Sequence, residues 1–321
     1  MAGKYNVCLD VGGTKILGVI FDENKEIVAR IKKRTKEDFD DLSSAEKVLR
    51  IVVKEMMDDA GISKKDLNAI SAGFPSVIDA ENGIILSTAN IPWNNVPIKA
   101  QMEKAFGVPF YAGNDVNLGV LGEHRYGAAR GYDHVVGLFI GTGIGGGLIL
   151  NGALYTGYLS KGAELGHIVL DTEGPLCPCG QRGCLEAFSS KKGIASYIRE
   201  QAARGRESMM TPYVQTGVFK SKYLKKALKK NDPLTVEAID RACYYLAAGT
   251  GTLINTFSPQ VVVYGGGVME ACGDQLLEKI LRHVDRFCMT SIRPTVELKV
   301  AELGDDSNVY GALAIIEDHQ N

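Results

Sequence analysis

Residues 164–186 read ELGHIVLDTEGPLCPCGQRGCLE, in which three cysteines follow a histidine in the spacing H-x9-C-x-C-x4-C. His167, Cys177, Cys179 and Cys184 offer the soft and borderline ligands that a tetrahedral structural zinc ion prefers. Four protein ligands close the coordination shell, so such a zinc ion would not activate water. The alternative is a group of buried or disulfide-linked cysteines beside an unrelated histidine, which the compact spacing disfavours.

Two glycines and two glutamates accompany these ligands. Gly180 and Gly183 lie between the last two cysteines, where a short loop must fold back and positive φ angles are expected. Glu164 and Glu186 stand on either side of the set. This arrangement suggests that the metal holds a loop whose polar groups meet a ligand.

The composition is that of an ordinary globular protein with room for two domains of medium size: 321 residues, 45% hydrophobic and 23% charged. The net charge of -2 provides no field that would attract nucleic acid or an anionic membrane. A lysine-rich stretch at 220–230 is better explained as the solvated face of a helix. No apolar run approaches the roughly 20 residues of a membrane-spanning helix, and a strand-like segment stands where a signal peptide would begin. We therefore expect a cytoplasmic protein without a membrane or nucleic-acid partner.

The order of the predicted elements indicates a repeated α/β unit. Residues 5–34 read as three short strands that form a meander, and strands and helices then alternate as far as a helix at 116–127. At residue 135 strand-like segments begin again around a glycine turn. The hairpins at 10–22 and 137–152 look like one unit used twice. We therefore predict an α/β fold of two duplicated domains with a cleft between them.

The boundaries of these domains follow from the same pattern. We place a smaller N-terminal α/β domain at residues 1–117 and complete it with a C-terminal helix at about 305–321. The larger domain covers residues 118–304 and contains the cysteine loop. Its helices are expected at 191–204, 221–230 and about 233–256, and a further helix is expected at 273–287.

The first glycine turn, in DVGGTK, brings together groups that suit a phosphate chain. Asp10 ends a strand, and Gly12, Gly13, Thr14 and Lys15 follow in a tight hairpin. Such a turn exposes backbone N–H groups, a hydroxyl and an ammonium toward one point. Asp10 is a candidate ligand for Mg²⁺ through water. A plain hairpin turn would use the same glycines and threonine and remains the alternative.

The second glycine turn, in GLFIGTGIGGGLIL, contains a G-x-G-x-x-G match that we interpret as accidental. A dinucleotide-binding fingerprint opens a helix, whereas a strand-like segment follows here. What remains is a phosphate clamp made of two hairpins. A third glycine cluster, GGGV, follows a predicted strand. An adenine ring can approach the backbone there, or the cluster is simply the turn between a strand and a helix. The predicted phosphate- and nucleotide-binding residues of this half are Gly141, Thr142, Gly143, Gly145, Gly265, Gly266 and Gly267.

The sequence GND places polar groups where a strand ends and a helix begins, the usual position of a ligand crevice in an α/β sheet. A phosphoryl acceptor needs a carboxylate that orients its hydroxyl and takes its proton late in the transfer, and Asp115 is our candidate for this base. Asp115 is alternatively the N-cap of the helix. Asn114, Glu164 and Glu186 can donate and accept the hydrogen bonds that several sugar hydroxyls require.

With these residues in place, the chain resembles the bacterial sugar kinases of the ROK family, in particular its glucokinases. The resemblance covers nearly the whole length through DVGGTK, GND, GTGIGGG, ELGH, CPCGQRGCLE and GGGV, and the cysteine motif is its most specific part. It implies an actin-like ATPase fold, which is ribonuclease H-like, with a structural zinc ion and magnesium-ATP. It also implies transfer of the γ-phosphoryl group to a hexose, in a glucokinase to the 6-hydroxyl of glucose.

Carried over by position, the resemblance makes Asp115 the catalytic base and gives His167 two roles. One imidazole nitrogen would bind zinc while the other points at a sugar hydroxyl. Ser76 departs from the family pattern, in which a glycine is commoner, and this concerns a local loop contact rather than the chemistry. The implied sugar-binding residues are Gly73, Asn90, Asn114, Asp115, Glu164, His167 and Glu186.

The ROK family also contains sugar-responsive repressors, which carry a helix-turn-helix domain ahead of the sugar-binding body. Here nine residues precede Asp10 and the phosphate turns are intact, so we expect a kinase. A zinc-dependent hydrolase is disfavoured because the fourth zinc position is filled. Glucose is the favoured substrate, with N-acetylmannosamine, N-acetylglucosamine and fructose as alternatives, and polyphosphate in place of ATP is left open. The resemblance also implies a homo-oligomer, either a dimer or a tetramer.

Overall fold

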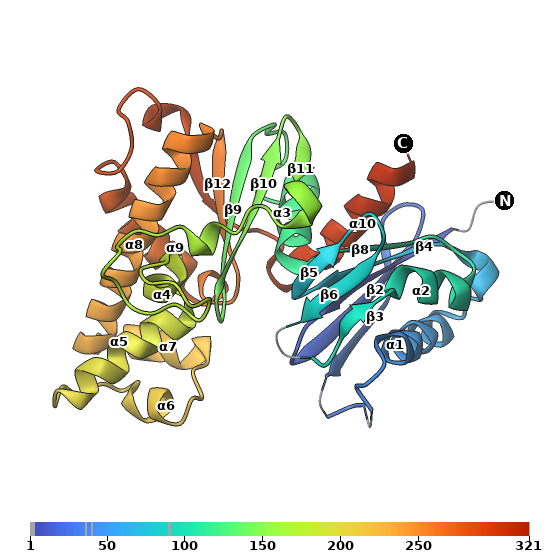
Figure 1. The fold of residues 1–321 in the computed structure, drawn as a ribbon, viewed down its shortest axis with the longest axis horizontal. Coiled ribbons are helices and arrows are strands. Elements are labelled where there is room, and N and C mark those ends of the chain that lie inside the picture. The colour runs from blue at the N-terminus through green and yellow to red at the C-terminus, as the bar shows by residue number, and fades with distance from the viewer. Residues whose placement is uncertain (1–3, 36, 40, 89–90, 321) are drawn as a thin grey trace. The chain divides into compact units, whose positions relative to one another are not determined.

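The computed structural model describes residues 4–35, 37–39, 41–88 and 91–320 and is shown in Figure 1. The chain forms two compact units. Unit 1 contains residues 1–130, 154–162 and 306–321, and unit 2 contains residues 131–153 and 163–305. The predicted domain boundary at residue 117 lies inside a helix of unit 1, Asp115–Tyr126. Within the described ranges, no helix is both long enough and apolar enough to cross a membrane.

Unit 1 is built on a five-stranded sheet in the order β3-β2-β1-β4-β8. β1, β2 and β3 pair antiparallel as successive hairpins, whereas β4 lies parallel to β1, and β8 lies parallel to β4. These strands are β1 (Tyr5–Val11), β2 (Lys15–Phe21), β3 (Ile27–Arg34), β4 (Leu67–Phe74) and β8 (Phe110–Asn114). A smaller sheet contains β5 (Ser76–Asp79), β6 (Ile84–Thr88) and β7 (Asn94–Val96). The helices are α1 (Ala45–Ala60), η1 (Lys64–Asp66), α2 (Ile98–Phe106), α3 (Asp115–Tyr126), η2 (Tyr158–Ser160) and α10 (Ser307–Gln320).

Different helices cover the two faces of the larger sheet, because successive residues of a strand point to opposite sides. In β1, Val7 and Leu9 belong to the hydrophobic cluster that contains Val48 of α1. Cys8 belongs instead to the cluster that contains Val309 of α10. The C-terminal helix is therefore part of the core of unit 1, although almost the whole chain separates it from β1 in sequence.

The contact between α3 and α10 depends on two glycines. A Cβ atom at Gly311 would overlap the carbonyl oxygen of Leu118, and one at Gly122 would overlap the carbonyl oxygen of Ser307. Both obstacles are backbone atoms, which cannot move aside by changing a rotamer. The two helices therefore approach each other with backbone in contact, and this closeness fixes the start of α3.

Gly311→Ala is expected to lower the free energy of unfolding by about 1–3 kcal/mol, the usual effect of overpacking, because the added methyl group must separate α10 from α3. Gly273→Ala is the matched control. Its Cβ atom would come no closer than 3.1 Å to atoms of a side chain, Val300. Urea denaturation measures the free energy of unfolding of both variants. An equal value for the two would contradict the proposed backbone contact.

Unit 2 contains a second five-stranded sheet, in the order β11-β10-β9-β12-β13. β9 and β10 form an antiparallel hairpin, and β12 pairs parallel with both β9 and β13. The strands are β9 (Val135–Ile140), β10 (Ile144–Leu150), β11 (Ala153–Tyr155, whose last two residues fall in unit 1), β12 (Val261–Gly265) and β13 (Glu297–Val300). The helices are η3 (Leu165–His167), α4 (Leu185–Ser189), α5 (Lys191–Ala203), α6 (Thr211–Gln215), α7 (Ser221–Lys229), α8 (Pro233–Phe257), α9 (Met269–Val284), η4 (Arg293–Thr295) and η5 (Gly304–Asp306, partly in unit 1).

The two sheets have the same topology. In each, the first two strands form an antiparallel hairpin, a third strand lies beside the second, and two later strands continue the sheet in parallel from the first strand. A glycine turn joins the first two strands in both cases. The predicted duplicated α/β fold is therefore confirmed, and it is the two-domain arrangement of strands and helices typical of actin-like ATPases.

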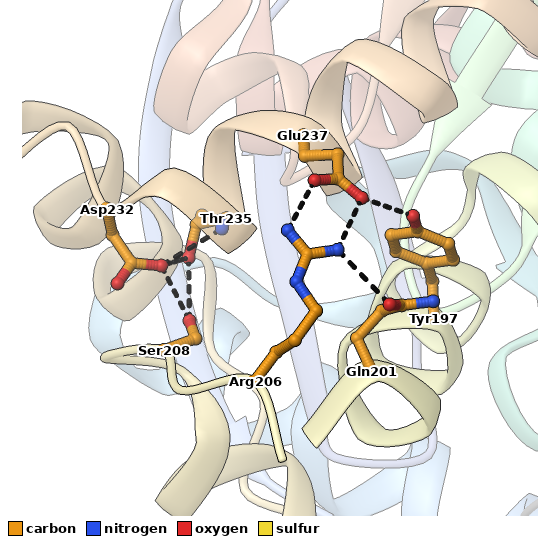
Figure 2. A network of polar contacts seen from close by, with 7 residues as sticks. All are labelled: Tyr197, Gln201, Arg206, Ser208, Asp232, Thr235 and Glu237. Carbon is orange, nitrogen blue, oxygen red and sulfur yellow. Dashed lines mark hydrogen bonds and ion pairs between the residues drawn. The ribbon is translucent and has the colours of Figure 1, made fainter. Parts of the chain in front are cut away.

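Polar contacts hold the helical part of unit 2 together, as Figure 2 shows. Arg206 forms an ion pair with Glu237 of α8, with 2.6 Å between Nη2 and Oε2, and the hydroxyl of Tyr197 in α5 donates to the same carboxylate over 2.5 Å. The guanidinium of Arg206 and the hydroxyl of Tyr197 lower the pKa of Glu237 to about 2. Asp232, the N-cap of α8, accepts a hydrogen bond from the hydroxyl of Ser208. These contacts tie α5 to the first turns of α8.

Candidate active site

The carboxyl ends of three neighbouring strands of unit 1 meet at one edge of its sheet. Asp10 of β1 lies opposite Gly73 of β4, and Gly73 lies opposite Gly113 of β8. The chain then enters α3 directly at Asp115. Because the strands are parallel and in this register, the side chains that follow them share the crevice typical of open α/β sheets.

Asn114, not Asp115, caps the helix. The side chain of Asn114 accepts a hydrogen bond from the backbone N–H of Asn117 at 3.0 Å, and its Nδ2 donates to the carbonyl of Ser76 at 3.3 Å. The interpretation of Asp115 as the N-cap is therefore wrong. Asp115 is the first residue of the helix, and its Oδ1 accepts from the N–H of Val116 at 2.9 Å. With the cap supplied by its neighbour, the carboxylate of Asp115 is available for another role.

The environment of Asp115 is suited to proton transfer. Burial and the nearby carboxylate of Asp10 raise the pKa of Asp115 to about 7. A general base works best when its pKa lies near the working pH, since it is then ionised and still able to hold a proton. Gly73 allows this placement, because a Cβ atom there would lie 3.4 Å from the Cα of Asp115 and 3.1 Å from a methyl group of Leu118.

Asp10 is oriented by a residue that the sequence analysis did not identify. Nδ2 of Asn308, the second residue of α10, donates to Oδ1 of Asp10 at 2.9 Å. Asp10 itself is buried at the end of β1. A buried, oriented carboxylate beside a phosphate turn suits a magnesium ligand that acts through water. The only signal for Asn308 in the sequence would have been its place at the start of the last amphipathic helix.

The first glycine turn is closed by its own backbone and held by a buried threonine. The N–H of Gly12 donates to the carbonyl of Lys15 at 2.8 Å. Thr35 donates twice to the turn, from its N–H to the carbonyl of Thr14 at 2.9 Å and from its hydroxyl to the carbonyl of Gly12 at 2.7 Å. Gly13 and Thr14 therefore lie in a turn whose carbonyl groups are bonded to the protein. Thr35 was also missed, because nothing in its local sequence distinguishes it.

The second glycine turn is held by a predicted sugar ligand. The N–H of Gly141 donates to the carbonyl of Gly143 at 2.9 Å, and the N–H of Ile144 donates to Oε2 of Glu186 at 2.8 Å. A Cβ atom at Gly143 would overlap this carboxylate oxygen. Gly145 follows within β10, so a strand and not a helix continues the turn. The structure thus excludes a dinucleotide-binding fingerprint here, as the sequence predicts.

The third glycine cluster lies beside the second. Gly265 ends β12, and Gly266 has a φ of +83°, which favours glycine. A Cβ atom at Gly266 would also come within 2.8 Å of the backbone of Ile140, the last residue of β9. The N–H of Val268 donates to the carbonyl of Ile140 at 3.0 Å. The second glycine turn and the third glycine cluster, both predicted to bind the phosphoryl donor ATP, are therefore neighbours at the ends of adjacent strands.

His167, Cys177, Cys179 and Cys184 form a compact cluster in unit 2, in which one ligand atom of each lies within 4.8 Å of the others. Nδ1 of His167 lies 3.6 Å from Sγ of Cys177, and Sγ of Cys179 lies 3.7 Å from Sγ of Cys184. Two Zn–S bonds of about 2.3 Å at a tetrahedral angle place their sulfurs about 3.8 Å apart, so this spacing fits a zinc site. The cysteines are free, so the disulfide alternative is wrong.

The loop that carries the cluster has the expected backbone. Gly180 and Gly183 have φ angles of +94° and +70°, as predicted for a loop that folds back. The N–H of Cys177 donates to the carbonyl of Gln181 at 2.7 Å. Because Nδ1 of His167 faces the sulfurs, Nε2 is the nitrogen left to meet a ligand.

Glu186 links this cluster to the second glycine turn. It follows Cys184 by two residues, in α4, and its Oε1 lies 3.8 Å from Sγ of Cys177 while Oε2 is bonded to Ile144. Glu164, which directly precedes the 3-10 turn of His167, has its carbonyl bonded to the N–H of His167 at 3.0 Å. A single short region thus contains the predicted sugar ligands of unit 2.

The predicted site residues fall into two sets, one in each unit. Unit 1 contains Asp10, Gly12, Gly13, Thr14, Lys15, Gly73, Asn114 and Asp115. Unit 2 contains Gly141, Thr142, Gly143, Gly145, Glu164, His167, Cys177, Cys179, Cys184, Glu186, Gly265, Gly266 and Gly267. Asn90, a predicted sugar contact, lies outside the described residues.

Comparison with known proteins identifies the family and supports the fold. A sequence model of the ROK family matches residues 6–319. A glucokinase from Thermotoga maritima is 34% identical over 97% of this chain and 96% of its own length. The crystal structure of a ROK family glucokinase from Streptomyces griseus, in complex with glucose and AMPPNP, is 27% identical, with a TM-score of 0.80 over 98% of this chain and 99% of its own. A xylose repressor from Bacillus subtilis is 27% identical over 98% of this chain and 77% of its own length.

Proposed function

Because the chain belongs to the ROK family, we propose that it is an ATP-dependent hexose kinase, and specifically a glucokinase that phosphorylates the 6-hydroxyl of glucose. Two similarities support this choice: the Thermotoga maritima relative is a glucokinase, and the Streptomyces griseus structure contains glucose and AMPPNP. The observation that carries the proposal is the carboxylate of Asp115, which has a pKa of about 7 and lies at the strand ends beside Asp10.

In this reaction Asp115 accepts the proton of the sugar 6-hydroxyl as the oxygen forms its bond to the γ-phosphorus. The bond between the γ-phosphorus and the bridging oxygen of ADP breaks at the same time. Proton transfer comes late in a loose transition state, so positioning of the hydroxyl contributes most of the catalysis. Asn114, Glu164, His167 and Glu186 are proposed to bind the other sugar hydroxyls.

Two metal ions are part of the proposal. Asp10 would hold Mg²⁺ through water, and the ion would neutralise charge on the phosphates of ATP. Zinc at His167, Cys177, Cys179 and Cys184 would be structural, because its four positions are filled by the protein. It would fix the ring of His167 with Nε2 directed to the sugar.

A coupled assay of ADP release across a panel of hexoses tests the proposal. We expect turnover with ATP and glucose, and a lower kcat/KM with N-acetylmannosamine, N-acetylglucosamine and fructose, because the Thermotoga maritima relative is a glucokinase. Parallel reactions with polyphosphate identify the donor. Absence of turnover with every sugar, together with sugar binding in calorimetry, would favour the class of the sugar-responsive repressors instead.

A further inference from the structure

Lys191 connects the two predicted donor-binding segments of unit 2. It is the first residue of α5, and its N–H donates to the carbonyl of Gly141 at 3.0 Å. Its Nζ lies 3.1 Å from the position that a Cβ atom would take at Gly267. The backbone of Lys191 is thus fixed to the second glycine turn, while its ammonium reaches the third glycine cluster.

The ammonium of Lys191 is poorly solvated. Burial lowers the pKa of this group, and the carboxylate of Glu270 is the charge that opposes the shift. Among the residues that the structure describes, no hydrogen bond or ion pair of the Lys191 side chain is found. Glu270 opposes the shift without an ion pair to Lys191, so a ligand with negative charge would find this half-buried cation incompletely compensated.

A cavity beside these groups has the charge that a phosphate-bearing ligand requires. It has a volume of about 520 Å³, and its lining includes Thr142, Lys191, Lys192 and Arg199. No aspartate or glutamate is among its lining residues. The N–H of Lys192 donates to the carbonyl of Thr142 at 3.4 Å, so this wall is anchored to the glycine turn. Thr142 of the second glycine turn and the two lysines at the start of α5 therefore line the same cavity, whereas Arg199 is bonded to the carbonyl of Val214.

We propose that Lys191 binds the phosphate chain of ATP between the second glycine turn and the third glycine cluster. This inference rests on the proposed kinase function and adds a donor-binding residue to it. The glycines offer backbone N–H groups and room for the ligand, whereas Lys191 adds a full charge at a place with little competing water. Charge-assisted hydrogen bonds to phosphate are roughly twice as strong as neutral ones.

Calorimetry with magnesium and AMPPNP, in the absence of sugar, tests the proposal. Lys191→Met keeps the apolar stem and the length of the side chain but removes the charge. We expect its Kd for AMPPNP to rise about tenfold or more, which is at least about 1.4 kcal/mol. Lys191→Arg should recover most of the affinity, because it restores a cation. The Kd for adenosine should stay the same, because adenosine has no phosphate.

Steady-state kinetics give an independent readout. Lys191→Met should raise the KM for ATP and leave the KM for glucose unchanged, since the side chain of Lys191 forms no hydrogen bond or ion pair with Glu164, His167 or Glu186, the sugar ligands proposed in unit 2. Lys226→Ala, which removes an exposed lysine of α7 outside the cavity, is the control and should behave as the wild type. A thermal melt of each variant shows whether its fold is intact.

The outcomes separate this inference from the proposed function. Normal AMPPNP affinity in a folded Lys191→Met protein that phosphorylates glucose would overturn the role of Lys191 and leave the kinase in place. An equal loss of affinity for AMPPNP and adenosine would also overturn it, because the contact would not be to phosphate. A wild-type protein that neither binds AMPPNP nor turns over any hexose would overturn both.

Discussion

Replacing Asp115 with asparagine is expected to lower kcat for glucose phosphorylation by about 10²–10⁴-fold, the usual contribution of a general base. Asparagine has the same shape, and its side-chain oxygen can still accept the hydrogen bond from Val116, so the start of α3 should not move. It cannot accept the proton of the sugar hydroxyl. The Kd for glucose, measured by calorimetry, should therefore change little while turnover is lost.

The pH dependence of the wild type provides a second measurement. Asp115 has a pKa of about 7, and only its ionised form can act as the base. The value of kcat/KM should therefore fall as the pH decreases below about 7 and level off above it. A profile without an inflection near neutral pH, or near-normal turnover in Asp115→Asn, would remove Asp115 from the role of base.

Stability should change in the opposite direction from activity. The pKa of Asp115 is about 7 in the folded protein against an ordinary value of 3.8, so the folded state binds more protons between these pH values. Its contribution to the free energy of unfolding therefore decreases as the pH rises through this window. Asp115→Asn removes the ionised buried carboxylate. We expect the variant to be more stable than the wild type above about pH 7, with a smaller difference toward about pH 4.

Local sequence was sufficient for the glycine turns and for the metal-ligand set. DVGGTK, GTGIGGG and GGGV each stand at the end of a predicted strand, and the structure has strands at all three places. The spacing of the cysteines determines a short loop, and its two glycines have the positive φ angles that the spacing predicts. These features depend on residues that are close in the sequence, where the steric preferences of glycine act directly on the backbone.

Features that depend on distant parts of the chain were not predictable in the same way. Asn308 orients Asp10 across almost the full length of the sequence, and Thr35 holds the first glycine turn from the far end of β3. The helix expected at 273–287 begins earlier, at Met269. Gly273 therefore lies inside it, with the space for a Cβ atom limited by Val300 of β13. When only the sequence is considered, a glycine that is required by packing inside a helix looks like the boundary of that helix.

Glu186 shows the same limitation within the site. Its position after the cysteine motif indicates a sugar ligand, but the structure also bonds it to Ile144 and places it beside Cys177. One carboxylate therefore contacts the second glycine turn and the metal cluster together. This coupling decides what loss of the metal should do, because the proposed sugar ligands and the proposed ATP-binding turn share one support.

Cys179→Ser is expected to lose zinc and to raise the Kd for glucose by about tenfold or more, which is at least about 1.4 kcal/mol, because the ring of His167 would no longer be oriented. His167 lies in a 3-10 turn of three residues, so a bound zinc ion would be the main restraint on its ring, whereas the second glycine turn is also held by the pairing of β9 with β10. The Kd for AMPPNP should therefore rise much less. Calorimetry measures both affinities, and metal analysis measures the zinc content.

Cys288→Ser, outside the cluster, is the matched control and should keep zinc and both affinities. An equal loss of the two affinities would instead show that the cluster stabilises unit 2 as a whole, acting through Glu186 on the glycine turn, and would end its specific role in sugar binding.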